Sequence, residues 1–194
     1  MDRLDIDAIT AYTPSRVTGA PNDAAVLVPI VPQMDGHALV FTKRSNHLEE
    51  HPGEKSFPGG GVEPGDGDRA ETAIREANEE IGVDPGSVSI VGRLDDIRTV
   101  TGYAVTPVVA YVPHRPYAPK DGEVAEVAVL PLERFLDDET YRSEYRRHPD
   151  YGSMQVHYFD VDGYTVWGAT ARILVQFLEL TTPFRPPSIG DDGD

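Results

Sequence analysis

The stretch that decides the fold is residues 57–83, which read FPGGGVEPGDGDRAETAIREANEEIGV. A phenylalanine, a proline and three glycines open it, and this composition indicates a turn in the backbone. Small apolar residues then recur with helical spacing, so we expect a helix over residues 68–81. Asp66 or Asp68 can cap the start of this helix, and Gly82 lies where a C-terminal cap is expected. The stretch therefore predicts a glycine-rich loop that leads directly into an amphipathic helix.

The glutamates of the predicted helix suggest a metal site. Glu76 and Glu80 are four residues apart and lie on one helix face, with Glu79 beside them. Three like charges at this spacing destabilise an isolated helix, and a hard divalent cation such as Mg²⁺ or Mn²⁺ would remove that cost. In so acidic a chain the alternative is an ordinary solvated acidic face.

The glycine loop favours the metal interpretation. Glycine lets the backbone approach a phosphate or a cation closely, so a carbonyl of Gly59 or Gly60 can complete a metal shell. The alternative is a plain turn between a strand and a helix. Arg75 can pair with a loop carboxylate such as Asp66 and hold the loop and the helix in register.

Apolar runs and turn signals on either side of this stretch predict an α/β domain. Asp35-Gly36 and Asp162-Gly163 indicate two hairpins. The expected strands cover residues 24–31, 37–42, 88–94, 105–112, 124–130, 156–161 and 164–166, and a closing helix covers 169–180. We expect one domain over residues 24–181, an N-terminal arm or short helix over 1–23, and a disordered acidic tail over 182–194.

The composition restricts the partners and the compartment. The formal net charge is −16, and lysine occurs only at positions 43, 55 and 120. Such a field repels long polyanions, so we expect no nucleic-acid partner. It fits either simple solubility or, as we favour, a halophilic protein adapted to high salt. No run is typical of a membrane span or a signal peptide, which predicts a cytoplasmic protein. The absence of cysteine excludes disulfides and thiolate metal ligands.

Some side chains outside the central stretch have two interpretations. Glu123 and Glu126 are candidates for a general base, although solvated charges are the interpretation that we favour. Trp167 is expected to pack in the core, and stacking against adenine is the alternative. Tyrosines and arginines over residues 141–147 follow helical spacing. We expect a solvated helix face there, with contact to a phosphate or to the second subunit of a homodimer as alternatives.

The central stretch resembles the Nudix box, G-x5-E-x7-R-E-U-x-E-E-x-G-U, in which U is aliphatic. The matching residues are Gly60, Arg75, Glu76, Ala77, Glu79, Glu80, Gly82 and Val83. Asp66 fills the first acidic position in place of glutamate, and eight residues instead of seven separate it from Arg75. The resemblance implies the Nudix fold, an α/β/α sandwich in which helices enclose a mixed β-sheet.

Segments outside the box resemble the coenzyme A pyrophosphatase branch of that family, whose further signature is L-L-T-x-R-[SA]-x3-R-x3-G-x3-F-P-G-G. Residues 40–45, Gly53 and residues 57–60 match it with the spacing preserved, and the one-residue insertion in the box also occurs in that branch. The similarity extends over residues 24–180. Glu49 is a departure, because the signature has an arginine at this position.

The resemblance implies a metal-dependent enzyme that hydrolyses a diphosphate linkage in a nucleotide-type small molecule. Coenzyme A, cleaved to 3′,5′-ADP and 4′-phosphopantetheine, is the substrate that the signature favours. Because Glu49 reverses a charge of the signature, another substrate stays open: ADP-ribose, a dinucleotide or a nucleoside triphosphate. A non-catalytic binding module of the same fold is the third possibility.

The resemblance also assigns roles to individual residues. The expected ligands of Mg²⁺ or Mn²⁺ are Glu76, Glu79, Glu80 and the carbonyl of Gly60. The expected catalytic residues are Arg75, Glu79 and Glu80, with either glutamate as a possible base. The expected substrate-binding residues are Arg44, Lys55 and Gly59.

Overall fold

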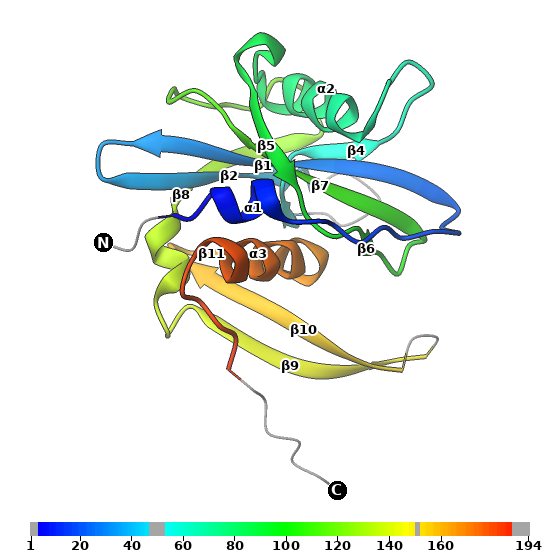
Figure 1. Cartoon of the computed structure of the whole chain (residues 1–194), viewed down its shortest axis with the longest axis vertical. Coiled ribbons are helices and arrows are strands. Elements are labelled where there is room, and N and C mark those ends of the chain that lie inside the picture. The colour runs from blue at the N-terminus through cyan, green and yellow to red at the C-terminus, as the bar shows by residue number, and fades with distance from the viewer. Residues whose placement is uncertain (1–3, 47–52, 150–151, 188–194) are drawn as a thin grey trace, which may run out of the picture.

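A mixed β-sheet with helices on both faces forms the core of the protein (Figure 1), which confirms the predicted α/β/α sandwich. The computed structural model describes residues 4–46, 53–149 and 152–187. Its helices are α1 (Asp7–Ala11), α2 (Arg69–Ile81) and α3 (Gly168–Thr181), with two short 3₁₀ helices, η1 (Pro85–Ser87) and η2 (Leu132–Leu136). Among these described residues, no helix is long and apolar enough to cross a membrane.

Strands of two sheets account for the rest of the regular structure. The large sheet contains β1 (Asn22–Gln33), β2 (Gly36–Arg44), β3 (Lys55–Ser56), β4 (Gly59–Gly61), β5 (Ser89–Arg93), β6 (Ile97–Arg98), β7 (Tyr103–Tyr111) and β8 (Val124–Pro131). The small sheet contains β9 (Tyr141–His148), β10 (Gly152–Val161) and β11 (Tyr164–Trp167). In the large sheet β1 pairs in parallel with β7 and antiparallel with β2 and β4, so β1 lies at its centre.

The helix α2 covers one face of the large sheet. Its small residues Ala70, Ala73 and Ala77 share one buried cluster with Leu27 of β1 and Val40 of β2. Alanine side chains allow the helix axis to approach the sheet closely, and this approach brings the polar residues of α2 near the strands below. The predicted apolar stripe therefore forms the contact between helix and sheet.

Phenylalanines and the other two helices fill the opposite face. Phe41 stacks on Phe57 with ring centroids 4.7 Å apart, and Phe135 lies 5.7 Å from Phe41. Burying Phe57 stabilises the fold by about 2 kcal/mol and anchors the start of the glycine run. α1 and α3 lie over this face in Figure 1, and Ile9 of α1 is 1% exposed. The short N-terminal helix therefore contributes to the core.

Backbone pairing changes the secondary structure of two predicted segments. Residues 59–61, expected to be loop, form β4 because their backbone pairs with β1 at residues 24–26. Residues 141–147, expected to form a solvated helix face, lie in strand β9. This strand pairs with β10 from Tyr141↔Phe159 to His148↔Gly152. Ladder hydrogen bonds to β10, the next strand in the chain, outweigh the local helical pattern in that segment.

The small sheet has two different faces, because side chains of successive strand residues point to opposite sides. Phe159 and Val166 belong to the inner face and are fully buried in the same cluster as α3. Tyr158 and Trp167 belong to the outer face, and β11 lies beside β3 of the large sheet. Phe184, in the segment expected to be a tail, packs against Tyr141 with ring centroids 5.4 Å apart. Tail residues 188–194 lie outside the described residues.

Candidate active site

The ends of α2 have the caps that the sequence predicts. The Asp68 carboxylate accepts hydrogen bonds from the backbone N–H groups of Ala70 and Glu71, at 2.7 and 3.0 Å. These bonds satisfy donors of the first turn that have no partner within the helix. Gly82 ends the helix in the left-handed conformation with φ of 69°, which glycine adopts without strain.

Arg75 joins the glycine-rich loop to α2. Its Nε and Nη2 atoms donate to the two carboxylate oxygens of Asp66, at 3.0 and 3.1 Å, and Nη2 also donates to the carbonyl oxygen of Gly61. These hydrogen bonds from Arg75 hold the pKa of Asp66 well below its usual range, and the backbone N–H of Glu63 acts in the same direction. The predicted pairing of Arg75 with Asp66 is confirmed, and it keeps the loop and the helix in register.

Glu76 lies directly against the glycine backbone. A Cβ atom added at Gly60 would stand 2.5 Å from the carboxyl carbon of Glu76, so glycine leaves the space that this carboxylate occupies. Arg75 Nη1 donates to Glu76 Oε1 at 2.9 Å. Burial raises the pKa of Glu76, and the hydrogen bond from Arg75 opposes that shift. Two of the predicted metal-binding residues, Glu76 and Gly60, are therefore neighbours.

Glu80 is buried, with 8% of its surface exposed. The backbone N–H of Gly59 donates to its Oε2 atom at 3.2 Å. Burial raises the pKa of Glu80 to about 8, the hydrogen bond from Gly59 opposes this, and the charges of Glu76 and Asp121 add to it. The nearby Arg44 lowers the same pKa. Burying a carboxylate is costly unless positive charge compensates for it, so Glu80 is poised to accept a cation.

Glu79 lies at the rim of this group. Its side chain is 54% exposed, and Oε2 lies 3.5 Å from Arg75 Nη1. Over the part of the chain that the structure describes, no three acidic or histidine side chains are gathered closely enough to hold a metal ion. The fold thus brings Glu76 and Glu80 onto two successive glycines, and it leaves Glu79 outside that contact.

Comparisons with known proteins agree with this arrangement. A family model described as the NUDIX domain matches residues 21–150. The chain belongs to the Nudix family. It is 40% identical over 166 residues to the "Uncharacterized Nudix hydrolase NudL" of Escherichia fergusonii, which covers 82% of this chain and 83% of that protein. This chain is therefore a Nudix hydrolase.

A plant relative and a solved structure extend the comparison. "Nudix hydrolase 15, mitochondrial" of Arabidopsis thaliana is 40% identical over 176 residues, which cover 87% of this chain and 61% of that protein. The crystal structure of a MutT/nudix family protein from Enterococcus faecalis has a TM-score of 0.52 and 15% identity, over 86% of this chain and 64% of that one. The structural likeness supports the Nudix fold alone.

The Nudix box of this chain fits a hard divalent cation. Nudix hydrolases generally use divalent metal ions. The carboxylates of Glu76 and Glu80 and the carbonyls of the glycine run supply the oxygen donors that Mg²⁺ and Mn²⁺ prefer. The burial that raises the pKa of Glu80 is consistent with this, because a cation beside the buried carboxyl would offset the cost of its burial.

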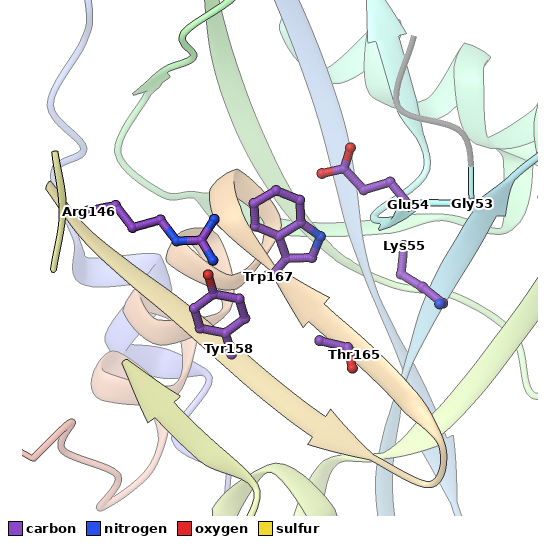
Figure 2. Close-up of a pocket in the computed structure, with 7 residues that line it drawn as sticks. All are labelled: Gly53, Glu54, Lys55, Arg146, Tyr158, Thr165 and Trp167. Atoms are coloured by element: carbon purple, nitrogen blue, oxygen red, sulfur yellow. The ribbon is translucent and has the colours of Figure 1, made fainter. Parts of the chain in front are cut away.

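The three predicted substrate-binding residues have different surroundings. Arg44 ends β2 near Glu80, whose pKa it lowers. Lys55 lines a cavity of about 270 Å³ next to the small sheet (Figure 2). At Gly59 the close neighbour is protein backbone, since an added Cβ would stand 2.4 Å from the carbonyl oxygen of Ala25. The structure thus brings Arg44 and Gly59 to Glu80, and it directs Lys55 toward a separate cavity.

The two candidate bases are Glu123, which precedes β8, and Glu126, which lies within it. Other side chains hold Glu126 in place. Its carboxylate accepts a hydrogen bond from the Tyr164 hydroxyl and lies 3.7 Å from Lys43 Nζ. Glu126 thereby connects β2, β8 and β11. At Glu123 the backbone carbonyl accepts the N–H of Ser45, which fixes the start of β8 against the end of β2.

Asp121 is an acid near the site that the sequence analysis did not identify. Its charge raises the pKa of Glu80, and its Oδ1 atom accepts the backbone N–H of Glu123 at 3.0 Å. The preceding residue, Lys120, donates its backbone N–H to the carbonyl oxygen of Glu80 at 2.9 Å. This loop is about 40 positions from α2 in the chain, and no local pattern reveals that contact.

Trp167 does not pack in the core as expected. It lies at the end of the edge strand β11 and is 38% exposed. Its ring stacks on Tyr158 of the neighbouring strand, with centroids 6.1 Å apart and an interplanar angle of 8°. Its neighbours in the chain, Val166 and Gly168, lie in the inner face and at the start of α3, so the indole points outward.

Proposed function

We propose that this Nudix hydrolase cleaves the diphosphate linkage of a nucleoside diphosphate derivative, most favourably coenzyme A, to 3′,5′-ADP and 4′-phosphopantetheine. The observation that carries the proposal is the position of the signature residues. Gly53 donates its backbone N–H to the carbonyl of Arg44 at 3.1 Å. The charge of Arg44 in turn lowers the pKa of Glu80. The segment that resembles the coenzyme A branch therefore adjoins the carboxylates of the Nudix box.

In this proposal the residues of the box bind the metal, position the loop and activate water. Glu76 and Glu80, with the carbonyl of Gly60 and with Glu79 at the rim, hold Mg²⁺ or Mn²⁺. A bound divalent ion neutralises the diphosphate and lowers the pKa of a water nucleophile. Arg75 acts as a positioning residue, because its guanidinium is engaged by Asp66, Gly61 and Glu76 within the protein.

The chain's own residues also prepare the diphosphate site. The exposed carboxylate of Glu79 can accept a proton from water, and Glu79 is the base that we propose because Glu80 is engaged by Gly59. Arg44 supplies positive charge next to Glu80, where the negative charge of a diphosphate needs compensation. With a net charge of −16, the protein attracts an anion only through such local groups.

A second candidate is hydrolysis of a different substrate, such as ADP-ribose, a dinucleotide or a nucleoside triphosphate. The observation that favours it is Glu49, which replaces the second arginine of the coenzyme A signature. Glu49 lies outside the described residues. If the missing arginine normally holds a phosphate of coenzyme A, this chain has lost that contact or supplies the charge from Arg44, Lys43 or Lys55.

A substrate panel tests the proposal. Purified protein is incubated at high salt with coenzyme A, ADP-ribose, diadenosine tetraphosphate or ATP, each with Mg²⁺ and with Mn²⁺, and the products are separated by chromatography. We expect the highest kcat/KM for coenzyme A and equal yields of 3′,5′-ADP and 4′-phosphopantetheine. Faster cleavage of ADP-ribose than of coenzyme A would favour the second candidate. No turnover in any of these mixtures would contradict both.

A charge reversal at position 49 sharpens the choice between the two substrates. Glu49→Arg restores the cation of the signature, so it should raise kcat/KM for coenzyme A relative to ADP-ribose. Glu133→Arg is the matched control, since Glu133 lies on the surface in η2 and receives the same change of charge. Equal effects of the two substitutions would show that position 49 does not recognise the substrate.

A further inference from the structure

We propose that the outer face of the small sheet, together with residues 53–55, forms a binding subsite for an aromatic base that carries a phosphate group. The subsite is the cavity of about 270 Å³ shown in Figure 2. It is lined by Gly53, Glu54, Lys55, Arg146, Tyr158, Thr165 and Trp167. The inference rests on the proposed function, in which the ligand is the adenine nucleotide half of coenzyme A.

A row of three residues across the small sheet builds the aromatic wall. Tyr158 of β10 pairs with Trp167 of β11 on one side and with Arg142 of β9 on the other. The Arg142 guanidinium carbon lies 3.9 Å from the centroid of the Tyr158 ring, and the indole stacks on the same tyrosine. The row is therefore a continuous stack of a cation and two rings.

Among the residues that the structure describes, the stack ends at Trp167, whose ring contacts Tyr158. Tyr158 is 5% exposed, whereas Trp167 is 38% exposed and lies on an edge strand. The indole is also the largest aromatic surface available for stacking in a protein, and stacking on a base tolerates any base identity. An aromatic base can thus continue the stack at Trp167.

Two cations, Arg146 and Lys55, line the same cavity as the exposed indole. In Figure 2 Arg146 of β9 lies on one side of Trp167, and Lys55 of β3 lies on the other side with its side chain extending away from the indole. Arg146 donates to Glu144 at 2.6 Å, and Glu144 in turn accepts the Tyr158 hydroxyl at 2.8 Å, so Arg146 is held in place beside the rings. Lys55 is one of three lysines in a chain of net charge −16. Glu54 adds one carboxylate to the lining.

These charges select the ligand. Arginine and lysine beside an aromatic surface match a phosphate attached to a base through a sugar, because each group then meets a complementary partner. A purely apolar ligand would contact the indole and would leave the charged side chains of the lining without an interaction. The cavity therefore fits a nucleotide better than a lipid or an apolar peptide.

The cavity is linked to the proposed catalytic face by backbone hydrogen bonds. Gly53 N–H donates to the Arg44 carbonyl at 3.1 Å, and Arg44 N–H donates to the Glu54 carbonyl at 2.9 Å. Gly53 and Glu54 line the cavity, and the charge of Arg44 interacts with the carboxylate of Glu80. One substrate could therefore place its base at Trp167 and its diphosphate near Glu80.

Part of this subsite lies outside the region that the Nudix family model matches. The family model ends at residue 150, whereas Tyr158, Thr165 and Trp167 follow it in the chain. The glycine loop and α2 lie within the matched region. We infer that the shared domain supplies the diphosphate chemistry and that β10 and β11 supply base recognition.

Trp167 provides its own reporter, because it is the single tryptophan of the chain. Protein in EDTA is titrated with 3′,5′-ADP, which contains base and phosphates but no diphosphate linkage, while indole fluorescence is recorded. We expect saturable quenching by 3′,5′-ADP and none by 4′-phosphopantetheine, which has a phosphate but no aromatic base. Absence of quenching by 3′,5′-ADP, or equal quenching by both compounds, would overturn the subsite.

Matched variants then locate the ligand by calorimetry. Trp167→Leu and Arg146→Met should each weaken 3′,5′-ADP binding roughly tenfold, whereas Trp167→Phe, which keeps a ring, should lose much less. Tyr145→Leu and Arg147→Met are the controls, because these exposed residues of β9 lie on the opposite face from Arg146. Weakening by the controls equal to that by the test variants would overturn the proposal.

The subsite and the proposed activity can fail separately. The titration needs neither metal nor turnover, so lack of coenzyme A hydrolysis would leave its result unchanged. Conversely, a protein that hydrolyses coenzyme A with the same KM in wild type and in Trp167→Leu would retain the proposed function and lose the proposed subsite. Circular dichroism on each variant verifies that the fold is intact.

Discussion

Arg75 and Asp66 face each other through two parallel hydrogen bonds, from Nε to Oδ1 at 3.0 Å and from Nη2 to Oδ2 at 3.1 Å. Only 6% of the Asp66 side chain and 22% of the Arg75 side chain are exposed. A paired fork of this kind adds directional precision to its electrostatic attraction. It fixes the loop above α2 and, through Arg75 Nη1, the carboxylate of Glu76.

Breaking this pair should cost both stability and activity. Asp66→Asn removes the carboxylate and leaves a partly buried guanidinium without its main partner, so the free energy of unfolding should fall by about 2 kcal/mol. Arg75→Lys keeps the charge but loses the fork, and it should behave similarly. Urea denaturation at fixed salt measures both. A loss under about 0.5 kcal/mol would show that the pair is energetically like a surface ion pair.

The Asp66–Arg75 pair should also make stability depend on acid pH. The folded protein lowers the pKa of Asp66, so this carboxylate stabilises the fold above the pKa of the unfolded chain, near 4. The contribution is lost as pH falls through the lower folded value. The difference in unfolding free energy between wild type and Asp66→Asn should therefore be full at pH 6 and shrink steadily below about pH 4. A difference that stays constant down to pH 2 would contradict this.

The three successive glycines of β4 should respond differently to alanine. At Gly59 an added Cβ meets the Ala25 backbone at 2.4 Å, so Gly59→Ala should lower the unfolding free energy by about 2–3 kcal/mol. At Gly60 it meets the far end of the Glu76 side chain, which can be displaced more easily than backbone, so Gly60→Ala should change stability little but lower kcat at least about tenfold. Gly61→Ala is the control, since nothing lies within 4 Å.

This series separates structural from functional roles of the loop. Thermal denaturation measures the stability of the three variants, and steady-state kinetics measures their activity. Gly61→Ala should stay within about 0.5 kcal/mol of wild type. Full activity in Gly60→Ala would mean that the position of Glu76 against the loop does not matter for turnover.

Removing the charge of Glu80 should abolish metal-dependent behaviour while preserving the fold. Glu80→Gln keeps the shape but not the ligand charge, so kcat should fall by at least about a hundredfold. Mg²⁺ or Mn²⁺ should raise the melting temperature of the wild type, as any ligand of the folded state does, and not that of Glu80→Gln. Glu133→Gln, on the surface in η2, is the control and should resemble wild type. An equal shift in all three proteins would place the metal elsewhere.

Without metal, Glu80→Gln should make the protein more stable at neutral pH. Burial raises the pKa of Glu80 to about 8, so the folded state prefers the protonated carboxyl. The stability of the wild type therefore declines as pH rises from the unfolded pKa, near 4, toward 8, whereas glutamine does not titrate. In EDTA, the advantage of the variant in urea denaturation should grow between pH 5 and pH 8. A constant advantage would refute the raised pKa.

Local interactions made much of this protein predictable from sequence. The start of α2 at Asp68 and its end at Gly82 depend on neighbours within a few positions. The pairing of Arg75 with Asp66 spans nine residues, so the chain itself keeps the two close. Membership of the Nudix family followed from the same stretch, because its residue types and spacing are rarely combined otherwise.

Strand pairing decided what the sequence left open. Residues 59–61 are a strand because β1 is beside them, and residues 141–147 are a strand because β10 is beside them. In both places ladder hydrogen bonds outweigh the local pattern, although β1 is distant from residues 59–61 in the chain and β10 directly follows β9. The influence of Asp121 on Glu80 likewise arises from a loop that is distant in the chain.

The sequence by itself determined the chemistry of the protein: carboxylates at helical spacing after a glycine-rich loop, together with the arginine that joins the two. Tertiary structure decided the solvent exposure of each carboxylate: Glu80 is buried and Glu79 is exposed. It also turned Trp167 outward beside Arg146. The physical reason is that ligand type is encoded by local spacing, whereas burial and cavities depend on which distant strands meet.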